Sequence, residues 1–117
     1  MVAGSTASSA VRSRRARRRI DPEELADNAR EASEFLKALA HETRLIILCM
    51  LIDGEKSVSQ IERKLDARQP FVSQQLARLR ADDLVEARRE GKNVYYSIAR
   101  PEVVDIVSSL HQAFCRR

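Results

Sequence analysis

The segment from Ser57 to Asp83 constrains the fold most strongly, because two apolar stripes of helical spacing flank a short turn within it. Val58, Ile61 and Leu65 form the first stripe, and Ser57 precedes them as a residue suited to a helix N-cap. The spacing predicts a helix over about residues 58–65 with one apolar face.

A second helix is predicted to follow the turn at residues 66–68, because Pro70 is well suited to a first helical turn. Its apolar stripe would face the domain and consists of Val72, Leu76 and Leu79. The opposite face is small, polar and free of acids, whereas an ordinary solvated helix usually mixes both signs of charge. Glutamine and arginine can pair with base edges, so the pattern predicts a helix-turn-helix. The predicted DNA contacts on this helix are Gln69, Pro70, Ser73, Gln74, Gln75 and Arg78.

Two short strands are predicted next, over residues 84–89 and 94–98, with Gly91 supplying the turn between them. Basic side chains crowd the tip of this hairpin. A basic hairpin after a DNA-reading helix is typical of a wing that contacts phosphate or the adjacent minor groove. We expect Arg89 and Lys92 to make those contacts.

Three further helices surround this segment in the sequence. The first is predicted from Asp21 to about Ala40, and the second ends near Gly54 with Cys49 on its inner face. The last begins at Pro101 and carries a long apolar stripe. The apolar stripe of the first helix is expected to pack on another subunit, because the chain is short.

The chain of 117 residues is long enough for one small domain, which we assign to residues 21–117. Residues 1–20 contain six arginines and no acid, so we expect a disordered tail that attracts phosphate or keeps the protein in solution. An organellar transit peptide has a similar composition. No apolar run has the length of a membrane span and no secretory signal opens the chain, so we expect a cytoplasmic protein.

Three stretches resemble the signature segments of the ArsR/SmtB winged-helix repressors: ALAHETRL, FVSQQLARLRADDLV and EGKNVYYSI. The resemblance covers residues 22–117. It implies an α-α-α-α-β-β-α order, a mainly α winged helix-turn-helix, a homodimer formed by the first and last helices, and a palindromic operator in double-stranded DNA. Glu42, Gln75 and Asp83 replace the more frequent Pro, His and Gly, which affects helix starts and base preference more than the fold.

Most members of that family sense metals, but both usual metal motifs are missing here. Residues 57–60 read SVSQ where paired cysteines are expected, and Val107 stands where a histidine should follow Asp105. We therefore expect no metal at these positions and no cofactor.

The two cysteines, Cys49 and Cys115, lie in contexts that resemble the sulfide- and persulfide-responsive SqrR/BigR branch. This resemblance implies that the reduced dimer represses. Persulfides or polysulfides would then link the cysteines of one subunit through a disulfide or polysulfide bridge and weaken DNA binding. Its implied targets are genes for sulfide handling.

Other interpretations of the cysteines remain open. Both could be small core residues, or they could join His111 in a site for a soft metal or metalloid. If they do sense sulfur, we expect Cys115 to react first, because Arg116 and Arg117 favour its thiolate whereas apolar neighbours disfavour that of Cys49.

Two other classes of protein fit the sequence less well. An enzyme, such as a small thiol oxidoreductase using Cys115, is disfavoured because the sequence has no Cys-x-x-Cys and no Gly-rich phosphate loop. A winged helix that binds only protein is disfavoured by the basic wing. The sequence therefore predicts a DNA-binding regulator.

Overall fold

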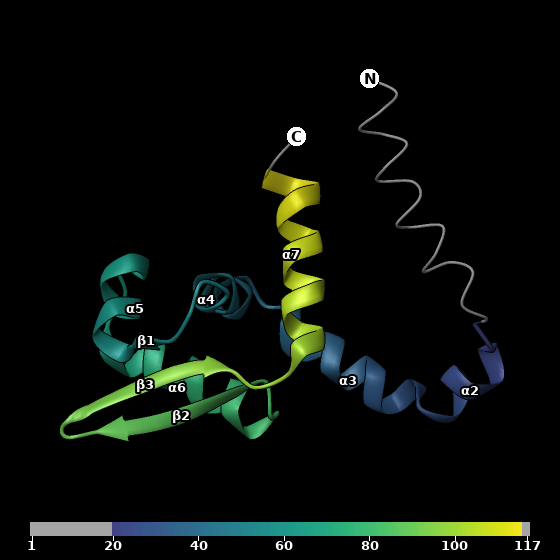
Figure 1. Cartoon of the computed structure of the whole chain (residues 1–117), viewed down its shortest axis with the longest axis horizontal. Coiled ribbons are helices and arrows are strands. Elements are labelled where there is room, and N and C mark those ends of the chain that lie inside the picture. Colours follow the sequence, from purple (N-terminus) through teal and green to yellow (C-terminus); the bar gives the residue numbers. More distant parts are fainter. Residues whose placement is uncertain (1–19, 116–117) are drawn as a thin grey trace. The chain divides into compact units, whose positions relative to one another are not determined.

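The computed structural model describes residues 20–115 and shows a winged helix-turn-helix (Figure 1). The predicted tail lies outside the described residues except for Ile20. The elements in chain order are α2 (Pro22–Asp27), α3 (Ala29–Leu39), α4 (Glu42–Leu51), β1 (Lys56–Ser57), α5 (Val58–Leu65), α6 (Gln69–Ala81), β2 (Val85–Glu90), β3 (Asn93–Ile98) and α7 (Pro101–Cys115). This order confirms the predicted fold class and adds the strand β1.

The chain divides between Ser33 and Glu34, inside α3, into two compact units. The first unit contains α2, whose C-cap residue Asn28 has a φ of −114° and a ψ of 9°. The Asn28 side chain donates a hydrogen bond of 3.0 Å to the carbonyl oxygen of Glu24. One continuous helix up to Ala40 was therefore the wrong prediction, because asparagine bonds the local backbone and interrupts the helix.

The second unit has its core where α4, α5, α6 and α7 meet. The predicted apolar stripe of α6 is confirmed, since its members are fully buried. In α4 the buried residues are Ile47, Leu48 and Leu51, whereas Cys49 is partly exposed and packs against the edge of the core. Most of α4 is apolar, so spacing alone could not identify its inner face.

A capping box fixes the start of α5. The Ser57 hydroxyl accepts a 3.2 Å bond from the Gln60 backbone N–H, and the Gln60 side chain accepts a 2.7 Å bond from the Ser57 N–H. The helix ends at Leu65, and its C-cap residue Asp66 has a left-handed φ of +52° that turns the chain toward α6. These residues confirm the predicted N-cap and turn.

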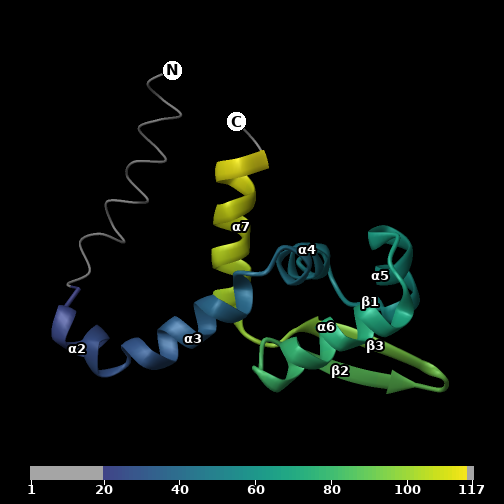
Figure 2. The ribbon, with the colours of Figure 1, turned by 180° about the vertical axis from the view of Figure 1, so that it is seen from behind.

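The sheet is antiparallel with the order β1-β3-β2. The hairpin of β2 and β3 has Glu90 opposite Asn93 at its tip, where Gly91 adopts φ +62°. Figure 2 shows this hairpin extending past the helix-turn-helix with its turn at the free end. Among the described residues, no helix is long and apolar enough to cross a membrane.

Candidate functional site

The outer face of α6 presents most of the residues predicted to contact DNA. Gln69, Pro70, Gln74 and Arg78 are exposed, and Ser73 is half-buried. The first turn has no acidic residue, and Arg78 and Arg80 give the last turn a positive charge. The arrangement suits a helix that enters the major groove of DNA.

Hydrogen bonds along α6 hold part of this face in place. Gln69 Nε2 donates to Ser73 Oγ over 3.2 Å, and Arg78 Nε donates to Asp82 Oδ2 over 3.0 Å. The guanidinium group of Arg78 carries four further N–H donors on its terminal nitrogens. Those donors suit a guanine edge or a phosphate.

Gln75 faces the interior of the second unit and not the outer face of α6. Its side chain is only 9% exposed, and its Oε1 accepts a 3.3 Å bond from Arg44, which also donates to the Ala38 carbonyl over 2.8 Å. The prediction that Gln75 contacts DNA is therefore wrong for this conformation. Its spacing from Val72 and Leu79 puts it on the buried stripe, a signal that the sequence already contained.

The wing has one arginine held by carboxylates and two exposed basic side chains at its tip. Arg88 bonds Glu55 over 2.5 Å and Glu90 over 2.7 Å, and its guanidinium lies 4.8 Å from the centre of the Tyr95 ring. The hydrogen bond from Arg88 lowers the pKa of Glu55. Arg89 and Lys92 are exposed, as their predicted role requires.

Cys49 and Cys115 are both free thiols, and they line the same cavity of about 270 Å³ between α4 and α7. Cys49 is half-buried and Cys115 is exposed. The other residues that line the cavity are Leu45, Ile46, Val107, Leu110, His111 and Phe114. The structure thus brings two cysteines that are far apart in the sequence to one mainly apolar cavity.

A metal site at these cysteines was the alternative interpretation. Cys49 and His111 also line a neighbouring cavity of about 370 Å³, together with Asp53. Within residues 20–115, however, no group of three or more His, Cys, Asp or Glu side chains is placed to hold a metal ion. The proposed ligand set of Cys49, His111 and Cys115 is therefore not assembled in this structure.

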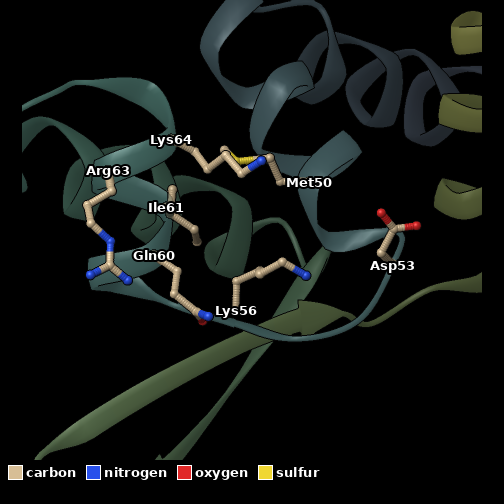
Figure 3. A pocket seen from close by; sticks show the side chains of 7 residues that line it. All are labelled: Met50, Asp53, Lys56, Gln60, Ile61, Arg63 and Lys64. Carbon is tan, nitrogen blue, oxygen red and sulfur yellow. The ribbon is translucent and has the colours of Figure 1, made fainter.

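A further cavity of about 410 Å³ lies between α4 and α5 and involves neither cysteine (Figure 3). Lys56, Arg63 and Lys64 contribute three positive charges against the one negative charge of Asp53. In Figure 3 the side chains of Lys64 and Met50 overlap in the view above the buried Ile61, and all three line the cavity. Sequence patterns do not predict this basic cavity, because it depends on how α5 packs beside α4.

Known proteins similar to this chain are transcriptional regulators. The family model described as bacterial regulatory protein, arsR family, matches residues 41–87. The biofilm growth-associated repressor of Agrobacterium fabrum is 44% identical over 74% of this chain and 74% of its own length. The transcriptional activator HlyU of Vibrio cholerae is 42% identical over 80% of this chain and 87% of its length.

A solved structure agrees with the fold. The transcriptional repressor BigR from Xylella fastidiosa has a TM-score of 0.78 at 35% identity, and the match covers 84% of this chain and 100% of that one. These relatives are regulators of transcription and not enzymes, which confirms the prediction that this chain is not an enzyme.

Proposed function

The chain belongs to the arsR family of bacterial regulatory proteins, and on that premise we propose that it is a homodimeric repressor released from its operator by reactive sulfur species. The proposed sensor residues are Cys49 and Cys115, and the proposed targets are genes for sulfide detoxification. The relatives described above include both repressors and an activator, so the sign of regulation is part of the proposal. We expect the protein in the cytoplasm, together with its DNA.

The observation that carries the sensor proposal is the shared cavity. Both thiols line it although 65 residues separate them in the sequence, and one belongs to α4 and the other to α7. Structural disulfides are rare in the cytoplasm, whereas exposed and reversible thiol pairs are typical of redox sensors.

The proposed chemistry has two steps. Cys115, the more exposed thiol, attacks the outer sulfur of an organic persulfide R–S–SH. The S–S bond breaks, R–SH leaves with the proton, and Cys115 becomes a persulfide. Cys49 then attacks Cys115 Sγ, the inner sulfur of that persulfide, so that the outer sulfur leaves as H₂S and a disulfide remains. If both cysteines are first converted to persulfides, loss of H₂S leaves a bridge of three sulfur atoms.

A bridge can influence DNA binding because α4 contacts both α7 and the DNA-reading helix α6. Joining α4 to α7 contracts the cavity between them and changes the support beneath α6. We propose that the bridged form holds the two α6 helices of the dimer away from the spacing of an operator.

Exposed apolar side chains on the second unit support the proposed homodimer. Leu36 on α3, Ile46 on α4 and Phe114 on α7 are 55%, 44% and 63% exposed. Ile46 and Phe114 line the same cavity, and such an apolar patch on a protein surface is typical of a surface that another subunit covers. Two-fold symmetry would match a palindromic operator.

The test combines intact-protein mass spectrometry with DNA binding on the same samples. Reduced protein is treated with an organic persulfide or, separately, with hydrogen peroxide, and its affinity is measured for a duplex selected from random-sequence DNA. We expect persulfide to remove two hydrogens with or without added sulfur, and to release the DNA. Cys49→Ser and Cys115→Ser should keep the DNA bound. Bridging with unchanged DNA affinity would refute the proposal.

A further inference from the structure

Phe71 is a large apolar side chain on a helix face that otherwise presents polar groups. Six large apolar side chains are exposed among the described residues, and Phe71 is the one of these on α6, with 40% of its surface exposed. The core does not need this ring, since the stripe that anchors α6 is already fully buried. An exposed phenyl group is favourably covered by an apolar surface of a partner.

Phe71 lies on the same side of α6 as polar residues that are proposed to contact DNA. It is the third residue of the helix, three residues before Gln74 and seven before Arg78. Residues at these spacings lie along one side of a helix. The first turns of a recognition helix are the part that reaches base edges in the major groove. Phe71 therefore stands at the edge of the proposed DNA-contacting face.

We propose that Phe71 recognises the 5-methyl group of a thymine in each half of the operator. In the major groove this methyl group is the apolar feature that a base pair presents, and phenylalanine is one of the side chains that contacts it. Gln74 and Arg78 would read hydrogen-bonding groups, whereas Phe71 would distinguish thymine from cytosine. The inference rests on the proposed function, because it requires α6 to enter the major groove.

The experiment replaces thymine by uracil, which removes only the methyl group. A duplex that the wild-type protein selects from random-sequence DNA is made with uracil at one symmetric pair of thymine positions at a time. Affinities for each duplex are measured with reduced wild-type protein, Phe71→Ala and Phe71→Leu. Circular dichroism confirms that each variant is folded.

We expect uracil at one pair of positions to weaken wild-type binding about fourfold for each thymine methyl group removed from the Phe71 ring. Phe71→Ala should bind the thymine and uracil duplexes equally at that position, and Phe71→Leu should keep part of the preference. Lys92→Ala is the matched control, because it should weaken binding while leaving the thymine preference intact.

Two results would overturn the inference while leaving the proposed function standing. The first is that uracil weakens DNA binding by the same factor in wild-type protein and in Phe71→Ala at every position. The other is a loss of affinity in Phe71→Ala with no thymine preference in the wild type, which would mean that the ring contacts the sugar-phosphate backbone. If the wild-type protein selects no sequence at all, the proposed function itself fails and the inference fails with it.

Discussion

Helices α6 and α7 both carry apolar stripes, but only α6 has its stripe completely buried within one chain. Leu76 and Leu79 are fully buried in α6. In α7, Val103 and Val107 are buried, whereas Phe114 near the end of the helix is 63% exposed. The fold of a single chain thus buries the stripe of α6, while the last part of α7 keeps apolar surface exposed.

This difference would place the two proposed functions, DNA recognition and sulfur sensing, in separate parts of the second unit. The fully packed helix presents the proposed DNA-reading face, and the cavity with both cysteines lies beside the incompletely covered part of α7. A loosely packed region can change shape at low cost in free energy, which suits a sensor. A firmly packed helix keeps its side chains in register, which suits base recognition.

The largest expected effect is on stability, and it compares a leucine from each helix. Leu76→Ala should reduce the free energy of unfolding by about 2–5 kcal/mol, because it leaves a cavity in the core. Leu110→Ala should cost about 1 kcal/mol, since Leu110 is only half-buried and already lines a cavity. Urea denaturation at one fixed protein concentration measures both. Equal losses in the free energy of unfolding would contradict the proposed difference in packing between α6 and α7.

The next prediction concerns the proposed dimer. Phe114→Ala should raise the dissociation constant of the dimer about 10- to 100-fold, because a large apolar side chain no longer becomes buried. Sedimentation velocity over a range of concentrations measures this constant. Phe71→Ala is the matched control, being another exposed phenylalanine, and should leave dimerisation unchanged. A similar shift for both variants would argue against α7 as the interface.

On α6, substitution should change DNA binding without changing assembly. Arg78→Ala should weaken binding to a selected duplex about 5- to 150-fold and relax base preference at one position per half-site. Lys92→Ala should weaken binding to selected and random duplexes equally and lower the magnitude of the slope of log affinity against log salt concentration by about one for each subunit. Fluorescence anisotropy at several salt concentrations distinguishes the two. An equal loss of affinity for both duplexes in Arg78→Ala would mean that Arg78 contacts phosphate and does not read a base.

The same contrast explains how much the sequence could predict. The stripe of Val72, Leu76 and Leu79 alternates with polar residues, so its spacing identified both the helix and its buried face. In α4, residues 45–51 are all apolar, so spacing could not show that Cys49 lies at the edge of the core. Local patterns therefore predicted the helices and strands better than they predicted the inner face of α4.

Contacts between distant segments were the part that sequence patterns could not supply. Arg44 bonds Gln75 across 31 residues, and Arg88 bonds Glu55 across 33. Both bonds change which polar groups are available for DNA. The shared cavity of Cys49 and Cys115 is of the same kind, because only the packing of α4 on α7 brings the two residues together. The family resemblance implied their pairing before any geometry could.

The smallest expected effect concerns Glu55, which joins the wing to the segment before α5 through its bond to Arg88. Because this hydrogen bond lowers the pKa of Glu55, the bond stabilises the wing at neutral pH and is lost as the pH falls through the lowered value. In a carboxyl NMR titration, Glu55 should titrate below an ordinary glutamate, and Arg88→Ala should raise its midpoint.

Glu55→Gln removes the charge that pairs with Arg88 at neutral pH, so a further arginine becomes available to phosphate. The slope of log affinity for DNA against log salt concentration should then increase in magnitude by up to about one for each subunit. An unchanged salt dependence would mean that Glu90 alone keeps Arg88 from the DNA, and the double substitution Glu55→Gln with Glu90→Gln would then be needed to free it.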